Sequence, residues 1–302
     1  MKPFTDVTGI AIDTRPGPVA VSELSARKEG TPDAVDIVAL NGDTLASACD
    51  EGLLEKLDWT QIGGRDHYLP QAISDCGVGS ALYAFVLAWD RDKFQGAPSW
   101  ADFWDVTKYP GKRGLKHDPE TNLEFALLAD GVAPGDIYRT LRTADGVDRA
   151  FRKLDQLRPY LVWWEASADA AKILGSGEVL MTSAANPTIV AANHATGRNF
   201  GMQWAASLSK LESWGVVKGS ANLRQAYQLL YVVGSSAIQA RLTAEGGYGG
   251  LAKGANDGLP PPILASSPTA PANLSAALPI DEQFWRENRE KLSQRFEQWL
   301  SK

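Results

Sequence analysis

Short apolar runs separated by longer stretches with helical spacing are the feature that most limits how this chain can fold. Residues 35–40 and 82–88 are rich in valine, leucine and alanine and have the length of buried strands. Longer segments whose apolar residues recur every three or four positions lie between such runs. Strands and helices therefore alternate along the chain, and this alternation predicts the α/β fold class.

The same periodicity places the other expected elements. We expect strands at residues 160–163, 178–182 and 215–217, and helices at residues 44–53, 122–130, 146–157, 168–174, 223–233 and 235–244. A closing helix should begin after Asp281, a favourable N-cap, and place Trp285, Phe296 and Trp299 on one face. Prolines recur between residues 258 and 272, which predicts an extended crossover without regular helix.

The length and charge of the chain restrict its organisation and its partners. A chain of 302 residues exceeds the size at which one hydrophobic core usually stops growing, which predicts two lobes and a cleft between them. No apolar stretch approaches the roughly 18 residues of a membrane span. The net charge of -6 argues against a nucleic-acid partner and permits a cationic ligand.

The first residues and the two cysteines bear on the cellular compartment. No basic segment followed by an apolar one is visible at the start of the chain, so either a signal peptide was removed or the protein is cytoplasmic. Cys49 and Cys76 match no metal-ligand spacing. A disulfide between them would contribute about 3–4 kcal/mol and would require an oxidising compartment such as the periplasm. Two buried free thiols are the alternative.

Signatures of catalysis are missing from the sequence. There is no G-x-S-x-G pentapeptide, and His67, His117 and His194 each stand without a second metal ligand at helical spacing. The glycines around Tyr248 do not form a G-x-G-x-x-G fingerprint, because Ala252 stands at the third glycine position. We therefore expect no catalytic residue, no metal and no cofactor.

One enzymatic alternative stays open. Paired carboxylates can act as general acid and base when the fold brings them together. Glu165 with Asp169 or Glu212 would then serve a carbohydrate-active or lyase-type enzyme.

A series of short motifs runs in one order along the chain. They are DIVAL at 36–40, EGLLEKLD at 51–58, FWD at 103–105, YPGKRG at 109–114, EFALLADGV at 124–132, WW at 163–164 with Ser167, GEV at 177–179, Trp204, SWGVVKGSAN at 213–222, GY at 247–248, WREN at 285–288 and FEQW at 296–299. Together they resemble the bacterial extracellular solute-binding proteins of the spermidine/putrescine ABC transporter type. The resemblance covers nearly the whole chain, from about Phe4 to Lys302.

The resemblance implies an architecture and a function. It implies a two-lobed, periplasmic-binding-protein-like type II fold, with residues 1–90 and 216–262 in the first lobe and residues 91–215 and 263–302 in the second. The crossings would lie near residues 88–93, 214–218 and 261–266, and closure about this hinge would bury the ligand in the cleft between the lobes. The protein would then be a monomeric, periplasmic component of an ABC importer that delivers a small amine-bearing solute to permease subunits.

The sequence departs from the family in two places. The strand and helix with which the family normally begins lie before Phe4, so the first lobe is expected to lack its first strand. Ala168 and Ala185 stand near positions where polyamine receptors carry an acidic residue and a tryptophan. A 4-aminobutyrate-like solute is therefore as good a candidate as spermidine or putrescine.

Five residues form the expected centre of the binding site. Glu212 aligns with the acidic ligand residue of the family, and a carboxylate is what a buried ammonium group needs. Trp164, Trp214 and Tyr248 offer aromatic faces to a cation and a methylene chain. Lys210 would pair with a ligand carboxylate.

Five further residues are expected around this centre. Asn41 and Asp43 follow a buried strand and Ser80 precedes another, which is where open α/β sheets present ligand contacts. Ser167 and Asn186 begin expected helices, where hydroxyl and amide groups can meet a carboxylate. Helix capping and turn formation are the alternative roles for these five residues.

Overall fold

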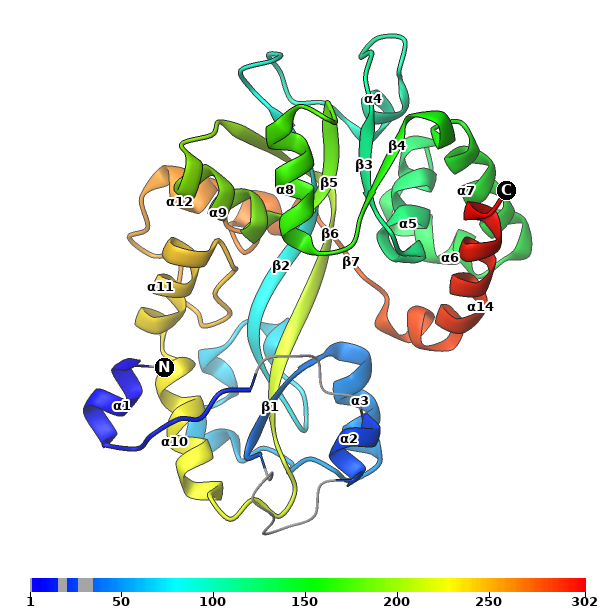
Figure 1. The fold of residues 1–302 in the computed structure, drawn as a ribbon. Coiled ribbons are helices and arrows are strands. Elements are labelled where there is room, and N and C mark those ends of the chain that lie inside the picture. The colour runs from blue at the N-terminus through cyan, green and yellow to red at the C-terminus, as the bar shows by residue number, and fades with distance from the viewer. Residues whose placement is uncertain (1, 16–20, 27–34) are drawn as a thin grey trace. The chain divides into compact units, whose positions relative to one another are not determined.

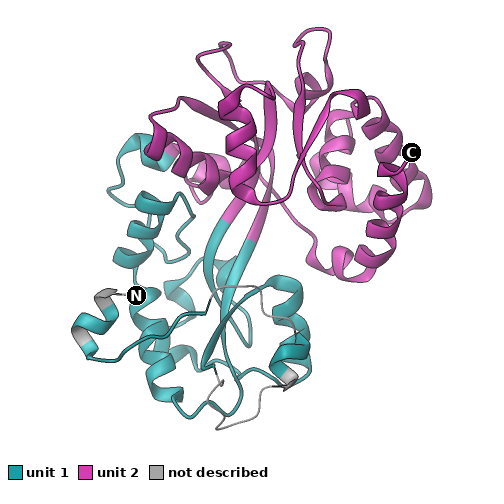
Figure 2. Ribbon diagram, in the orientation of Figure 1, with its two compact units in different colours: residues 1–82, 211–264 teal, residues 83–210, 265–302 magenta. Residues whose placement is uncertain are grey.

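The chain divides into two compact units, each formed from two separate stretches of sequence. The computed structural model describes residues 2–15, 21–26 and 35–302. Unit 1 comprises residues 1–82 and 211–264, and unit 2 comprises residues 83–210 and 265–302 (Figure 2). The strands β2 (Val78–Asp90) and β6 (Phe200–Val216) each continue from one unit into the other. Residues 83–90 therefore group with unit 2 and residues 211–215 with unit 1, which differs by a few positions from the expected lobes.

Unit 1 is built around β1 (Ile37–Asn41), which pairs antiparallel with the end of β6, from Ile37 opposite Val216 to Asn41 opposite Glu212 (Figure 1). Because side chains alternate along a strand, the pair has two different faces. Val38 and Leu40 pack with α2 (Val21–Ala26) and α3 (Gly42–Asp50). On the other face Ile37 and Trp214 pack with α1 (Lys2–Thr8) and α10 (Leu223–Val233).

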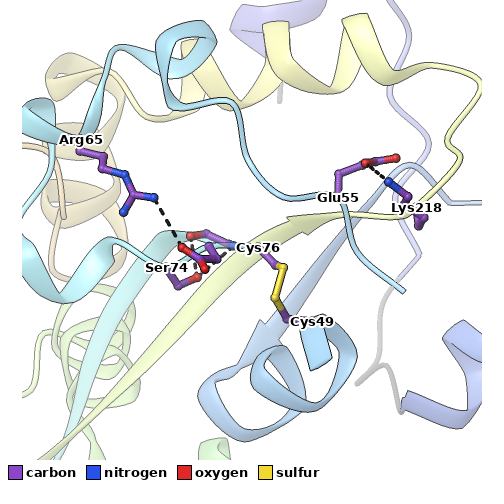
Figure 3. The surroundings of a disulfide bond; sticks show 8 residues. Cys49, Glu55, Arg65, Ser74, Cys76 and Lys218 are labelled. Atoms are coloured by element: carbon purple, nitrogen blue, oxygen red, sulfur yellow. Dashed lines mark hydrogen bonds and ion pairs between the residues drawn. A yellow bond between two sulfur atoms is a disulfide. The ribbon is translucent and has the colours of Figure 1, made fainter. Parts of the chain in front are cut away.

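Unit 1 also holds η1 (Trp59–Ile62), η2 (Arg65–His67), η3 (Pro70–Ala72) and α11 (Ser236–Gly246). A disulfide joins Cys49 at the end of α3 to Cys76 just before β2, with the two Cα atoms 5.7 Å apart (Figure 3). The sequence left open a disulfide or two free thiols, and the structure contains the disulfide. Beside it, Lys218 Nζ lies 2.7 Å from Glu55 Oε2, and Arg65 pairs with Asp75 at 3.6 Å.

Unit 2 contains a parallel group of strands. β3 (Arg113–Lys116) lies between β5 (Met181–Ala185) and β4 (Leu161–Trp164), and β5 also pairs antiparallel with β2. The helices around these strands are α4 (Trp100–Trp104), α5 (Pro119–Ala129), α6 (Ile137–Leu141), α7 (Ala144–Asp155), α8 (Ser167–Ser176), α9 (Asn186–Thr196) and α14 (Glu282–Leu300). The short strand β7 (Leu278–Pro279) pairs with β6, and the short helices η4 (Pro134–Asp136) and η5 (Arg158–Tyr160) complete the unit.

The α/β class is confirmed, and most expected elements occur within a few residues of their predicted bounds. The closing helix is α14: the Asp281 side chain accepts a 2.8 Å hydrogen bond from the Phe284 backbone nitrogen, and Trp285, Phe296 and Trp299 are buried. The expectation of no helix between residues 258 and 272 is wrong, since α12 (Pro261–Ala265) and α13 (Pro271–Ala276) both occur. Their prolines stand in the first helical turn, where a missing N–H costs nothing. None of the helices in the described ranges has the length and apolarity to cross a bilayer.

Candidate functional site

The first group of expected site residues lies in unit 1, at the end of the β1–β6 pair. Asn41 is directly opposite Glu212, so the two side chains are neighbours on one face of the strands. Asn41 also caps α3, since its Oδ1 accepts a 3.1 Å hydrogen bond from the Thr44 backbone nitrogen. Asp43 accepts from the same nitrogen at 2.7 Å. The register thus places an amide and a carboxylate side by side, while the capping bonds fix the junction of β1 and α3 where the amide lies.

Tyr248 is the aromatic residue that the fold places near Glu212. Burial raises the pKa of the Tyr248 hydroxyl, and the negative charge of Glu212 raises it further. The Tyr248 backbone is held beside β2, because Gly249 exchanges two hydrogen bonds with Leu82, of 2.7 and 3.1 Å. The half-buried phenol and the carboxylate of Glu212 therefore act on each other within unit 1.

Ser80 and Trp214 lie on the strands that carry this group. Ser80 is buried, and its backbone oxygen accepts a 3.4 Å hydrogen bond from the Gln239 side chain. Trp214 follows Glu212 by two positions on the same face of β6, and its indole packs with Phe4, Leu229 and Val233. The described contacts of Trp214 are those of a core residue.

The second group lies in unit 2, where β5, β3 and β4 run parallel and therefore end at the same edge of the sheet. The helices α5, α8 and α9 begin just after these ends, which brings their first residues to one edge. Ser167 is exposed at the start of α8. Asn186, by contrast, is fully buried: its Oδ1 accepts a 2.9 Å hydrogen bond from the Ala84 nitrogen, and its Nδ2 lies 3.4 Å from the Ser266 oxygen.

Trp164 ends β4 inside the core of unit 2. Its indole is almost completely buried, and within the described ranges no acceptor lies within hydrogen-bonding distance of Nε1. The neighbouring Trp163 forms edge-to-face contacts with Phe296 and Trp299 of α14. Trp163 therefore packs β4 against the closing helix.

Lys210 is engaged in a buried ion pair that the sequence does not reveal. Its Nζ lies 2.6 Å from Oε1 of Glu120, and the two side chains are 11% and 3% exposed. Arg289 of α14 contacts the other carboxylate oxygen of Glu120 and lies 3.5 Å from Asp118. Lys210 therefore neutralises Glu120, whereas the sequence predicted it to pair with a ligand carboxylate. No sequence signal marked Glu120, because its partners lie far away in the chain.

Two carboxylates of the enzymatic alternative, Glu165 and Asp169, lie in unit 2 near the start of α8. Asp169 is bonded to Lys172 at 2.7 Å, and this hydrogen bond lowers the pKa of Asp169, which is the wrong direction for a general acid. Glu165 is exposed in unit 2, whereas Glu212 belongs to unit 1. Among the residues that the structure describes, no group of three or more histidine, cysteine, aspartate or glutamate side chains is arranged to hold a metal.

Two α/β units, each formed from two stretches of chain and joined by continuous strands, define the periplasmic-binding-protein class of fold. The comparison with protein families identifies the chain within it: the model of the bacterial extracellular solute-binding proteins matches residues 1–272, so the chain belongs to that family. It is an ABC-type solute-binding protein and not an enzyme.

Known relatives agree in fold and sequence. A gamma-aminobutyric acid-binding protein of Pseudomonas aeruginosa PAO1 is 41% identical over 268 residues, which are 88% of this chain and 76% of the relative. A solved GABA receptor structure is 30% identical, with a TM-score of 0.84 over 99% of this chain and 91% of the other. An ABC transporter substrate-binding protein of Bradyrhizobium japonicum USDA 110 is 29% identical, with a TM-score of 0.85 over 99% and 93%.

Proposed function

We propose that this protein captures a small amine-bearing solute outside the cytoplasmic membrane, as a monomer, and delivers it to the permease of an ABC importer. The observation that carries the proposal is Glu212, which stands opposite Asn41 and acts electrostatically on Tyr248. The names of two relatives suggest the solute class, since one is a gamma-aminobutyric acid-binding protein and the other a GABA receptor. The disulfide agrees with this location, because such bonds persist in oxidising compartments.

The chemistry of the unit 1 group suits an ammonium. An unpaired ammonium that leaves water loses several kcal/mol of hydration, so its binding site must provide a carboxylate and further acceptors. In this proposal Glu212 supplies the charge, the Asn41 amide oxygen shares in orienting the group, and the Tyr248 ring covers the cation. An aromatic face over a cation contributes about 0.5–2 kcal/mol. In unit 2, Ser167, at the exposed start of α8, is a residue that we propose as a contact for a carboxylate.

The solute that we favour is 4-aminobutyrate or a similar ω-amino acid rather than a polyamine. A polyamine carries an ammonium at each end and would require a second acidic contact. In unit 2 the carboxylate of Glu120 is already neutralised by Lys210 and Arg289. Residue 168, where polyamine receptors tend to be acidic, is alanine here.

Thermal denaturation with a panel of solutes tests the proposal. At a concentration of 100 times Kd a ligand adds about 2.7 kcal/mol to the free energy of unfolding, which raises Tm by roughly 5–10 °C for units of this size. We expect that rise with 4-aminobutyrate and a smaller one or none with putrescine, spermidine and glutamate. No rise with any amine or amino acid would contradict the proposal.

The variant Glu212→Gln tests the residue that carries it. The substitution keeps the shape and removes the charge, so calorimetry should show an affinity loss of about 30-fold or more, corresponding to at least about 2 kcal/mol. Glu165→Gln, an exposed carboxylate of unit 2, is the matched control and should bind like the unsubstituted protein. Unchanged affinity in Glu212→Gln would remove Glu212 from the site.

A further inference from the structure

The helix α11 ends beside Tyr248, and the chain that follows is bonded back to α11 and to β2. Gly247 ends the helix in the left-handed conformation, with φ at 72° and its nitrogen 3.0 Å from the Thr243 backbone oxygen. On the other side, Gly249 exchanges two hydrogen bonds with Leu82 of β2. Tyr248 therefore stands between two backbone anchors.

Two buried side chains of α11 hold the next two residues. Thr243 Oγ1 accepts a 3.2 Å hydrogen bond from the Gly250 nitrogen, and Gln239 Oε1 accepts a 2.8 Å hydrogen bond from the Leu251 nitrogen. The two side chains are 1% and 2% exposed, so water does not compete for these bonds. The backbone also lies close against α11, since a Cβ at Gly250 would be 2.8 Å from that of Ala255 and 3.2 Å from that of Gln239.

The amide of Gln239 uses both of its ends. Its oxygen accepts from Leu251, and its nitrogen donates to the Val233 oxygen at 3.0 Å and to the Ser80 oxygen at 3.4 Å. These bonds fix the orientation of the amide and join the end of α10, the start of β2 and the chain after Tyr248 to one side chain. Because the sequence predicts both Ser80 and Tyr248 at the solute, one buried residue supports two of the expected contacts.

We propose that two residues of α11, Gln239 and Thr243, are positioning residues for solute recognition. They hold Tyr248 beside Glu212 and do not touch the solute themselves. The inference rests on the proposed function, in which the Tyr248 ring covers the ammonium group that Glu212 neutralises. A ring that is already in place loses little conformational freedom when the solute binds, so its contact contributes more to affinity.

Calorimetry with 4-aminobutyrate measures the consequence for affinity. Thr243→Val keeps the shape of the side chain and removes the acceptor of the Gly250 nitrogen. Gln239→Met likewise removes the acceptor of the Leu251 nitrogen. Each substitution should weaken binding roughly tenfold, because the solute must then order the ring and the backbone beside it.

Two controls separate positioning from a general loss of stability. Thr243→Ser keeps the hydroxyl that Gly250 needs, so it should bind within about twofold of the unsubstituted protein. Asn193 of unit 2 is the matched amide, since its Oδ1 accepts from the Phe200 nitrogen at 2.9 Å and its Nδ2 donates to the Phe200 oxygen at 3.0 Å. Asn193→Leu should lower Tm and leave the affinity within about twofold.

A double-mutant cycle tests whether the α11 residues act through Tyr248. In a Tyr248→Ala background there is no ring to position, so adding Thr243→Val or Gln239→Met should change the affinity by less than about twofold. Independent effects would add instead. A tenfold loss in both backgrounds overturns the inference.

Fluorine NMR reports the position of the ring without any solute. Protein labelled with fluorotyrosine gives one signal that Tyr248→Phe removes. This signal should shift or broaden in Thr243→Val and in Gln239→Met, and it should stay unchanged in Asn193→Leu. An unchanged signal in both α11 variants overturns the inference whatever the affinities are. Failure of the proposed function would appear differently, as an unsubstituted protein that binds no amine, and the signal would still decide whether α11 positions the ring.

Discussion

Glu124 makes the stability of unit 2 depend on pH in a predictable direction. It lies fully buried on α5, where its Oε1 accepts hydrogen bonds from Trp285 Nε1 at 2.7 Å and from the Tyr138 hydroxyl at 3.0 Å. Within the described ranges Oε2 has no hydrogen-bond partner. Burial dominates and raises the pKa of Glu124 from 4.5 to about 7, although the two hydrogen bonds oppose it.

The direction of this pH dependence follows from the difference in the pKa of Glu124 between the folded and the unfolded state. Because the folded pKa lies above the unfolded one, the folded state holds the proton more tightly, and the neutral acid is accommodated at no charge penalty below about pH 4.5. As the pH rises through 7, the carboxyl ionises in an apolar interior and this stability is lost. A difference of about 2.5 pKa units corresponds to roughly 3 kcal/mol at 1.36 kcal/mol per unit.

Glu124→Gln measures this effect. Glutamine keeps an oxygen for Trp285 and Tyr138 and cannot ionise, so its free energy of unfolding lacks the loss between pH 5 and pH 8. Urea denaturation followed by tryptophan fluorescence should show the variant gaining about 2–3 kcal/mol over the unsubstituted protein across that range, with the two close together at pH 5. Other titrating groups cancel in the difference. The control Glu165→Gln should show a flat difference, and a flat difference for Glu124→Gln itself would refute a buried, proton-holding carboxyl.

Three other substitutions have definite expected outcomes. Glu120→Gln removes the counter-ion of buried Lys210 and should lower the free energy of unfolding in urea by about 3 kcal/mol; a loss below about 1 kcal/mol would mean that the pair is solvated. Replacing Cys49 and Cys76 together with serine should lower it by about 3–4 kcal/mol, and dithiothreitol should do the same to the unsubstituted protein but not to the variant. Asp281→Ala removes the cap of α14 and should lower Tm by roughly 2–4 °C, for about 1 kcal/mol; an unchanged Tm would show that burial alone holds the start of the helix.

The sequence predicted the elements whose patterns are strong and local. The amphipathic helix at 223–233 agrees with α10, and the capped closing helix agrees with α14. It predicted only the last residues of β6, since that strand of 17 residues has runs of buried and of half-exposed positions without regular alternation and contains Lys210 and Glu212. It missed β3 because Arg113, in a strand of four residues, reads as a surface residue. In the structure Arg113 is fully buried, with its guanidinium donating to backbone oxygens of Phe103 and Tyr109.

The candidate site likewise contains residues that sequence motifs could identify and residues whose roles depend on distant partners. The family motifs directed attention to Glu212 and Tyr248, and the structure places the two within electrostatic reach. Glu120 escaped prediction because its importance comes from Lys210 and Arg289, which are distant in sequence and meet it only through packing of β6 and α14 against the start of α5. Asn186 was expected at a ligand but ties down the Ala84 nitrogen, a role that depends on which strand lies beside it.

The place of α14 in the core of unit 2 has a consequence for how the chain folds. Phe284, Trp285 and Phe296 are fully buried in the same core as Leu115 and Phe125, so this core is complete only when residues 282–300 are in place. Unit 1 likewise needs residues 211–264 before β1 gains its partner strand. Neither unit can therefore fold from its first stretch alone, and the folding of each unit depends on residues that lie further along the chain, after a stretch that belongs to the other unit.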